Sequence, residues 1–317
     1  MSESNIQNRP VLAVAISPAT HEDREKLQQA LSDLAQQDSA IRITREPLNG
    51  QTIISGTGEA HLKEICRRIL LEYKVQVDAD EPKVIYVETI RKDAEGEGSF
   101  MRQIGGRGQY AHVKVRLEPG EPGSGYQFVD ETSSGAVASG FAESVNFGIQ
   151  EAMKGGVLAG YEMIDVKAIF YDCSYHDVDS NEMAFKIAGS MAFNEAARRA
   201  SPVLLEPVMS VEILVPEEYI GSIMGDLNAR RGRIESMDHH AGLPAIRANV
   251  PLAEMLGYET HLRLSAQGRA KYSMHFNCYE VAPRRGERGG DQIGVTANKP
   301  KGPKAGRGFA SAKLDEE

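Results

Sequence analysis

The sequence predicts an α+β protein in which two ferredoxin-like βαββαβ plaits flank an elongated α+β domain. The order strand, helix, strand, strand, helix, strand occurs near both ends of the chain, and a hairpin signal lies inside each copy. The middle of the chain differs, because its strands are longer and it contains a Gly-rich insert. We therefore predict domains at residues 1–82, 83–206 and 207–282, followed by a basic, Gly/Pro-rich, disordered tail at 283–317.

The first plait is predicted from hydrophobic periodicity. Leu27, Leu31 and Leu34 recur at helical spacing, and Thr20 is the predicted N-cap of their helix. Residues 47–50, Pro-Leu-Asn-Gly, supply turn residues between two β-branched runs. The predicted strands are residues 11–16, 41–46, 51–55 and 75–78, and the predicted helices are residues 21–38 and 58–73.

The second plait repeats this order. Pro216 and Pro251 each precede a predicted helix, and proline favours the first position of a helix. A hairpin is predicted around residues 238–242, Asp-His-His-Ala-Gly. The predicted strands are residues 208–215, 233–237, 245–250 and 272–279, and the predicted helices are residues 217–229 and 252–264.

The middle domain is predicted to alternate long strands with two helices. A polar, Gly-containing segment separates its first two strands, and a Gly/Pro loop follows at residues 118–125. Ser180 or Asn181 is the predicted N-cap of the second helix. The predicted strands are residues 83–91, 109–117, 126–130 and 163–170, and the predicted helices are residues 138–154 and 182–200.

Two polar loops of the middle domain are candidate functional segments. Residues 171–181 present His176, Asp177 and Asp179 between a strand and a helix. Three interpretations stay open on these residues alone: a solvated connection, a metal or acid/base site, and a recognition loop for a polyanion. His-x-x-Asp with no second His or nearby Glu is a weak pattern for a metal or an acid/base pair.

The other candidate loop is Gly105-Gly106-Arg107-Gly108-Gln109-Tyr110. Its glycines allow the backbone to approach another backbone or a phosphate closely. A dinucleotide fingerprint fits poorly, because this loop leads into a strand and does not open a helix. A flexible hairpin connection is the alternative.

Composition limits the class of protein. Of the 317 residues 41% are hydrophobic and 26% charged, enough for well-packed cores, and the three cysteines lie far apart, which favours free thiols. No signal peptide or membrane-spanning run is recognisable, so we expect a cytoplasmic protein. With a net charge of -9, any contact with nucleic acid should be local and depend on shape. The basic tail either touches phosphates or only keeps the chain soluble.

Longer motifs identify a relationship. The chain resembles the C-terminal half of bacterial elongation factor G, the translocation GTPase, over about residues 11–283. The motifs that carry this resemblance are Arg-Gly-Gln-Tyr at 107–110, Ser-Tyr-His-Asp-Val-Asp-Ser at 174–180, Pro-Val-Leu-Leu-Glu-Pro at 202–207, Gly-Asp-Leu at 225–227, Arg-Arg-Gly at 230–232, Met-Leu-Gly-Tyr at 255–258, Gly-Arg-Ala at 268–270 and Tyr-Ser-Met at 272–274.

The resemblance implies the family's domains III, IV and V, with the tip of domain IV entering the decoding site. There the tip would contact the tRNA–mRNA duplex, whose shallow A-form minor groove displays 2′-hydroxyls and base edges. Asp177 and Asp179 are expected to stabilise turns, cap the helix or orient His176, and direct contact with the RNA is the alternative. The residues implied for the tip are Gly106, Arg107, Gly108, Gln109 and Tyr110 from one loop and Ser174, Tyr175, His176, Asp177 and Asp179 from the other.

The resemblance also implies contacts with the large ribosomal subunit. Arg230, Arg231, Arg269 and Lys271 are the positions expected to meet its RNA, and a solvated basic face is the alternative. The expected partners are the ribosome, through 16S and 23S rRNA and the stalk-base proteins, and the tRNA–mRNA duplex. No membrane contact is expected, and the chain is expected to be a monomer.

The sequence departs from the family in one respect. No Gly-x-x-x-x-Gly-Lys-[Ser/Thr] loop occurs, so we expect no enzyme activity, no metal site and no cofactor in this chain. GTP and magnesium would bind only a GTPase domain N-terminal to these residues, joined in cis if the chain is a fragment. The alternative is a stand-alone relative without a GTPase domain that modulates or protects the ribosome.

Overall fold

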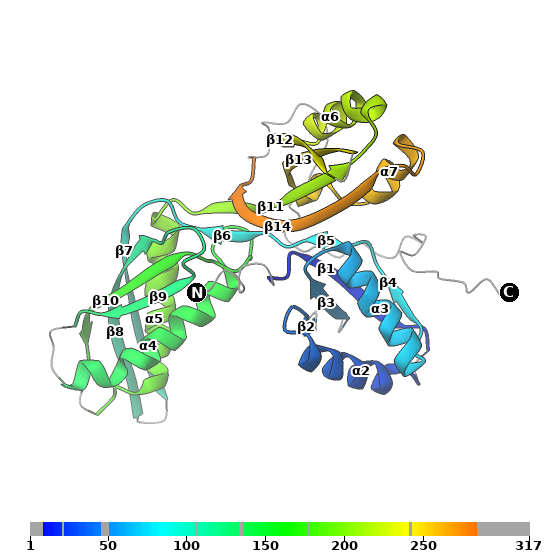
Figure 1. The fold of residues 1–317 in the computed structure, drawn as a ribbon. Helices are drawn as coiled ribbons and strands as arrows, with labels where there is room; N and C mark the ends of the chain where they lie inside the picture. Colours follow the sequence, from blue (N-terminus) through cyan, green and yellow to red (C-terminus); the bar gives the residue numbers. More distant parts are fainter. Residues whose placement is uncertain are drawn as a thin grey trace. The chain divides into compact units, whose positions relative to one another are not determined.

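Two compact units make up the chain (Figure 1). One unit combines residues up to 85 with residues 206–280, and the other spans residues 86–205. The computed structural model describes residues 9–20, 22–45, 51–104, 107–132, 136–176, 178–240 and 243–283. The predicted tail from residue 284 onward lies outside the described residues.

The first plait has the predicted element order. Its sheet has the strand order β2-β3-β1-β4, with β5 also pairing to β1, and the register is antiparallel throughout. Leu27, Leu31 and Leu34 are buried as their spacing predicts. The elements are β1 (Leu12–Pro18), α2 (Arg24–Gln37), β2 (Arg42–Arg45), β3 (Thr52–Gly56), α3 (Glu59–Tyr73), β4 (Val77–Ala79) and β5 (Lys83–Val84).

The predicted start of the first helix is wrong. Helix α2 begins at Arg24 with Asp23 as its N-cap residue, and the Thr20 hydroxyl instead donates a hydrogen bond of 2.7 Å to the Asp23 carboxylate. Thr20 therefore binds the cap residue and is not the cap itself. The helix begins three residues later than predicted. The turn predicted at residues 47–50 lies outside the described residues.

The second plait has the same topology, with strand order β12-β13-β11-β14. Its second helix was predicted as one piece but is divided, because Gly257 adopts a left-handed φ of 70° between a 3-10 turn and α7. The elements are β11 (Val203–Leu214), the 3-10 helix η1 (Glu217–Tyr219), α6 (Ile220–Ala229), β12 (Arg233–His240), β13 (Leu243–Pro251), the 3-10 helix η2 (Leu252–Glu254), α7 (Tyr258–Ser265) and β14 (Lys271–Val281). Together the two plaits confirm the predicted α+β class.

The unit of residues 86–205 contains a four-stranded sheet in the order β7-β8-β10-β9. Strands β7, β8 and β10 are antiparallel, whereas β9 and β10 are parallel and joined by α4. Valines of β8 and Phe170 of β10 face the buried side chains of α5 in one core. The elements are β6 (Val87–Thr89), β7 (Ala94–Ile104), β8 (Arg107–Pro119), β9 (Tyr126–Asp130), α4 (Ala136–Gly155), β10 (Val166–Ser174) and α5 (Glu182–Arg199).

Strand β7 contradicts the prediction that a polar segment merely separates two strands. A Cβ added at Gly96 would lie 2.4 Å from the Ala192 carbonyl oxygen, and one at Gly98 would lie 2.0 Å from that of Ala188. The glycines therefore let β7 lie directly against α5, which presents Ala188, Ala192 and Ala196 at helical spacing. Low strand propensity is outweighed here by close packing.

Candidate nucleic-acid interface

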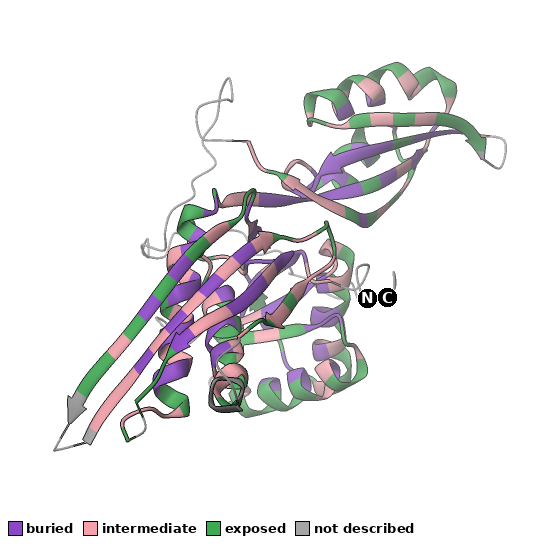
Figure 2. Ribbon diagram, turned by 90° about the vertical axis from the view of Figure 1, so that its left-hand side faces the viewer, coloured by how far each residue is buried: buried purple, intermediate pink, exposed green. Residues whose placement is uncertain are grey.

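The two candidate loops meet at one end of the unit of residues 86–205. Strands β7 and β8 form a long antiparallel hairpin (Figure 2), and the described part of the first loop, residues 107–110, is the start of β8. Strand β10 ends at Ser174, paired with His112 of β8, and the second loop leads from there to α5. The pairing of β8 with β10 thus brings segments about 70 residues apart to one edge.

Hydrogen bonds join the loops into one structure. The Tyr110 amide donates to the Asp179 carbonyl oxygen at 2.9 Å. The Ser180 hydroxyl donates to the Tyr110 carbonyl oxygen at 2.7 Å and accepts from the His176 amide at 2.8 Å. Ser180, predicted as one of two possible N-caps, thus bridges the two loops. The cap of α5 is Asn181, whose Oδ1 accepts from the Ala184 amide at 2.9 Å.

Gly108 fits against the Asp179 side chain. A Cβ at this position would lie 2.6 Å from the Asp179 carboxyl carbon, closer than any side chain could approach. The glycine therefore allows the first loop to lie against the carboxylate of the second. The structure does not describe Gly106, the side chain of Arg107, or Asp177, so these predicted tip residues lie outside the described residues.

His176 is an exposed side chain of this tip with described contacts. Its Nδ1 lies 3.5 Å from Asp179 Oδ2 and accepts a long, 3.4 Å hydrogen bond from the Val178 amide, while 60% of the side chain is exposed. These contacts turn Nδ1 toward its own loop. Nε2 is therefore the ring nitrogen placed to meet a partner outside the chain.

Side chains around His176 give the tip both polar and apolar surface. Gln109 and Tyr110 are half-buried, and Ser174 is exposed. Tyr175 is 39% exposed and Val178 is 83% exposed. Gln109 can donate and accept hydrogen bonds, which suits the base edges and hydroxyls of a nucleic-acid groove.

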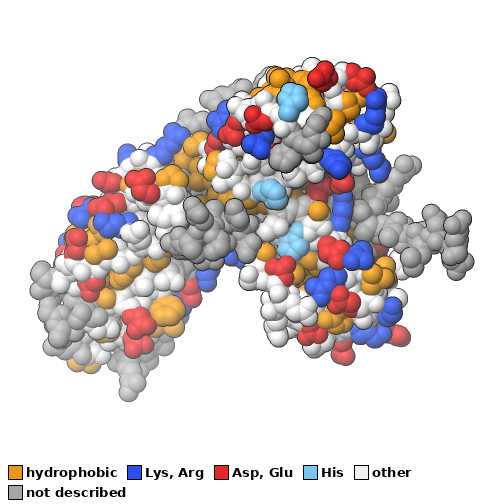
Figure 3. All heavy atoms as spheres, viewed as in Figure 1, with side chains coloured by type: hydrophobic (Ala, Val, Ile, Leu, Met, Phe, Trp, Pro, Cys, Tyr) orange, Lys and Arg blue, Asp and Glu red, His pale blue; other side chains and the backbone are white. Residues whose placement is uncertain are grey.

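Side chains of opposite charge pair on the part of the sheet next to the tip, so their charges largely cancel. Lys114 lies 2.9 Å from Asp172, and this hydrogen bond raises the pKa of the lysine. Burial raises the pKa of the Cys173 thiol to about 11, and the nearby carboxylates add to the rise. On the face shown in Figure 3, Lys and Arg side chains are likewise interspersed with Asp and Glu. Such a surface does not attract phosphates by bulk charge.

Two of the four predicted basic positions are engaged within the second plait. Arg230 Nε lies 3.1 Å from Asp226, and its guanidinium stacks on the Tyr258 ring at 4.8 Å. Arg231 has a left-handed φ of 62° and forms a two-pronged ion pair with Glu206, which is only 2% exposed. This pairing raises the pKa of the Arg231 guanidinium. Both arginines thus have structural partners that the sequence did not reveal.

The other two basic positions are more accessible. Arg269 stacks on the Tyr219 ring at 4.9 Å and pairs with Glu218 at 2.6 Å, while half of its side chain is exposed. Lys271 is exposed at the start of β14. Tyr219 and Arg230 lie at opposite ends of α6, so the four positions are not gathered into one cluster.

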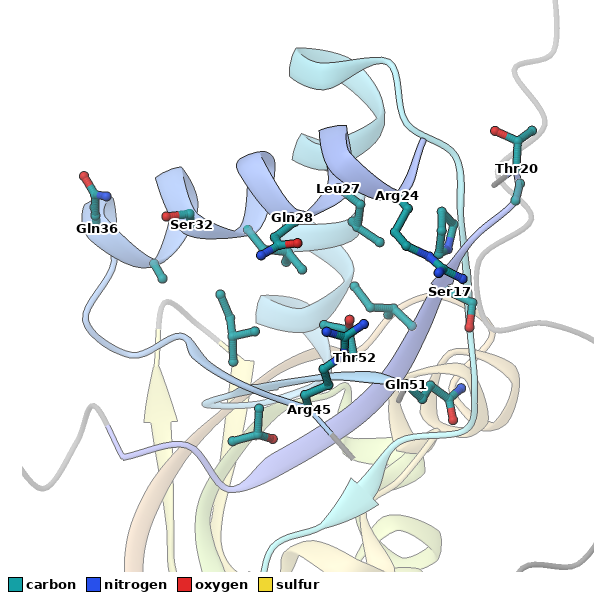
Figure 4. Close-up of a pocket in the computed structure, with 17 residues that line it drawn as sticks. Ser17, Thr20, Arg24, Leu27, Gln28, Ser32, Gln36, Arg45, Gln51 and Thr52 are labelled. Atoms are coloured by element: carbon teal, nitrogen blue, oxygen red, sulfur yellow. The ribbon is translucent and has the colours of Figure 1, made fainter. Parts of the chain in front are cut away.

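A groove of about 960 Å³ lies between α2 and strands β1, β2 and β3 of the first plait (Figure 4). Leu27, Leu31 and Ile43 supply apolar lining, with Arg24 and Arg45 as its charged side chains. None of its described lining residues is Asp, Glu, His, Cys or Lys.

In the described part of the chain, no cluster of three or more His, Cys, Asp or Glu residues is arranged to hold a metal ion. Nor does any described helix combine the length and apolar character needed to cross a membrane.

Three family models match consecutive parts of the chain. They are those of elongation factor G domain III at residues 8–81, elongation factor G domain IV at residues 82–201 and the elongation factor G C-terminus at residues 203–287. The chain belongs to the elongation factor G family. It corresponds to the family's C-terminal half, as the sequence motifs imply, and both candidate loops fall within the part that matches domain IV.

A solved structure is similar to this chain over most of its length. The protein in the crystal structure of ttk003000868 from Thermus thermophilus shares 41% sequence identity with this chain, and the two structures have a TM-score of 0.68. The match covers 87% of this chain and 41% of that one. The chain thus spans less than half the length of this relative.

Proposed function

We propose that this chain is the ribosome-binding portion of an elongation factor G-type translation factor. Its tip, residues 106–110 and 174–179, enters the decoding site and contacts the tRNA–mRNA duplex during translocation. The chain itself hydrolyses no GTP; hydrolysis belongs to a GTPase domain outside these residues. Large-subunit RNA is met on the second plait, with Arg269 and Lys271 the accessible positions among the four predicted.

The joining of the two loops supports this function most directly. Hydrogen bonds from Tyr110 to Asp179 and from Ser180 to Tyr110 hold them as one tip, so Gln109 and His176 are presented from adjacent backbone. A groove reader needs such a fixed arrangement, because its contacts are short and directional. The acidic net charge of -9 suits a factor that must also leave RNA, since bulk attraction would slow release.

The test uses the complete factor in a single-round translocation assay with GTP hydrolysis measured in parallel. His176→Ala and Gln109→Ala should slow translocation by roughly tenfold, the effect of losing about 1.4 kcal/mol, while hydrolysis stays nearly unchanged. Gln127→Ala, an exposed glutamine on β9 of the same sheet, is the matched control and should behave as wild type. Unaltered translocation in both tip variants would refute the assignment.

A further inference from the structure

Ser180 lies between the two candidate loops and the N-terminus of α5. It directly precedes Asn181, the cap residue, whose oxygens accept from the amides of Phe185 at 3.2 Å and Ala184 at 2.9 Å. Both of these helix residues are fully buried in the core of the unit of residues 86–205. The core therefore fixes where Ser180 lies, because a single peptide bond joins it to the cap residue.

The Ser180 hydroxyl carries this fixed position into both loops. Its O–H donates to the Tyr110 carbonyl oxygen of the first loop at 2.7 Å, and its oxygen accepts from the His176 amide of the second loop at 2.8 Å. A serine hydroxyl has one donor and two acceptor positions, so one group can make both hydrogen bonds at once. Because its only proton is used inside the chain, the hydroxyl is placed to hold the loops and not to donate to a bound RNA.

The second loop holds Tyr110 at two points. The Tyr110 amide donates to the Asp179 carbonyl oxygen at 2.9 Å, while its carbonyl oxygen accepts from Ser180. The pairing of β8 with β10 ends at His112 and Ser174, so residues 179 and 180 extend the hold of the second loop on β8 toward the tip. One hydrogen bond would let the loops rotate about it, whereas two directional bonds fix their relative orientation.

We propose that Ser180 is a positioning residue for the RNA contact: its hydroxyl sets the relative orientation of Gln109 and His176 and does not itself touch RNA. The inference rests on the proposed function of the tip. Gln109 directly precedes Tyr110, and the His176 amide is the other group that Ser180 holds. Without the hydroxyl, both main-chain groups lose a partner, and the two recognition side chains no longer share one frame.

The single-round translocation assay on the complete factor tests this role. Ser180→Ala should slow translocation by roughly tenfold with GTP hydrolysis nearly unchanged, because the net loss of one or two hydrogen bonds is of that order. Ser180→Thr keeps a hydroxyl and should stay within about threefold of wild type. Ser99→Ala, which removes an exposed hydroxyl on β7 of the same sheet, is the matched control and should behave as wild type. Ser180→Ala at the wild-type rate, or Ser180→Thr as slow as Ser180→Ala, overturns the proposal.

A combined variant separates positioning from an independent effect of Ser180. When Gln109→Ala and His176→Ala are both present, no recognition side chain is left to position, so adding Ser180→Ala should slow translocation by less than about twofold. A further loss of roughly tenfold there overturns the proposal, because Ser180 would then act independently of those side chains. Normal translocation in Gln109→Ala and His176→Ala themselves would refute the proposed function, whereas slow tip variants beside a normal Ser180→Ala refute only the positioning role.

Hydrogen exchange measured by NMR on the chain itself gives a readout that needs no ribosome. In Ser180→Ala the His176 amide, which loses its acceptor, should exchange about tenfold faster or more, while the Ala184 amide, held by the Asn181 cap, should keep its wild-type rate. An unchanged His176 amide overturns the proposal. Equal acceleration of both amides does the same, because it would show that the start of α5 has frayed and that the effect is not confined to the tip.

Discussion

Glu88 provides the sharpest test of the packing in the unit of residues 86–205. Its side chain is fully buried, and its two carboxylate oxygens accept five backbone N–H groups at 2.6 to 3.2 Å. The donors are consecutive: residues 157 and 158 bond Oε2, and residues 159 to 161 bond Oε1. One carboxylate thus organises the whole loop that follows α4.

Glu88→Gln keeps the shape of the side chain and replaces one acceptor oxygen by an NH2 donor. When the carbonyl oxygen of the new side chain takes the Oε1 position, it keeps the three hydrogen bonds from residues 159–161. Its NH2 group then faces the backbone N–H groups of Val157 and Leu158, donor against donor, and those two hydrogen bonds are lost. Hydrogen bonds to a charged group contribute about 1.5–3 kcal/mol each, so losing two should cost about 3–6 kcal/mol. That is a large share of the roughly 5–15 kcal/mol that stabilises a domain.

Urea unfolding followed by circular dichroism measures this cost, with hydrogen exchange of residues 157–161 assigning the transition to this unit. Exchange of these amides in Glu88→Gln should accelerate by at least a hundredfold. Glu143→Gln, an exposed carboxylate on α4 of the same unit, is the control and should change stability by less than about 0.5 kcal/mol. A Glu88→Gln variant with the urea midpoint of the control would show that the five bonds do not stabilise the fold.

Three further predictions concern packing, a buried ion pair and a thiol. Gly98→Ala should destabilise by about 1–3 kcal/mol in urea unfolding because its Cβ meets α5 backbone, whereas Gly140→Ala, with open space around it, should stabilise by about 0.5–1 kcal/mol. Arg231→Ala should cost about 2–3 kcal/mol because it leaves Glu206 buried without its partner, whereas Arg233→Ala, whose ion pair is exposed, should leave the urea midpoint nearly unchanged. Alkylation of Cys173 in the native chain should be slow at about pH 8 and accelerate toward its raised pKa of about 11, and equal rates in the native and urea-unfolded chain at about pH 8 would contradict this.

The repeated βαββαβ order could be predicted because hydrophobic periodicity is a local property. Leu27, Leu31 and Leu34 specify the buried face of α2 without reference to any other part of the chain. Helix ends were less predictable. Thr20 has the right side chain for a cap, but Asp23 occupies the cap position, and only the backbone path after β1 decides between them.

Strand β7 could not be predicted from its own residues. Gly and Glu are depleted in strands, and the reason that Gly96 and Gly98 are suitable lies about ninety residues later, in Ala188 and Ala192 of α5. The same holds for Arg231, whose residue type suggests a contact with RNA. Its partner, Glu206, lies 25 positions earlier in the sequence. The two residues meet only because β11 packs beside the turn that follows α6.

The tip was predictable in its residue types but not in the way its two loops are joined. Its polar residues were predictable as loop residues, but the contact between the loops depends on the register of β8 with β10, which no local pattern specifies. The junction uses main-chain groups of Tyr110, His176 and Asp179 together with the Ser180 hydroxyl, and it does not use the side chains of Gln109 or His176. Removing either side chain should therefore leave the tip assembled, so a translocation defect in those variants would reflect a lost contact with the RNA and not a lost fold.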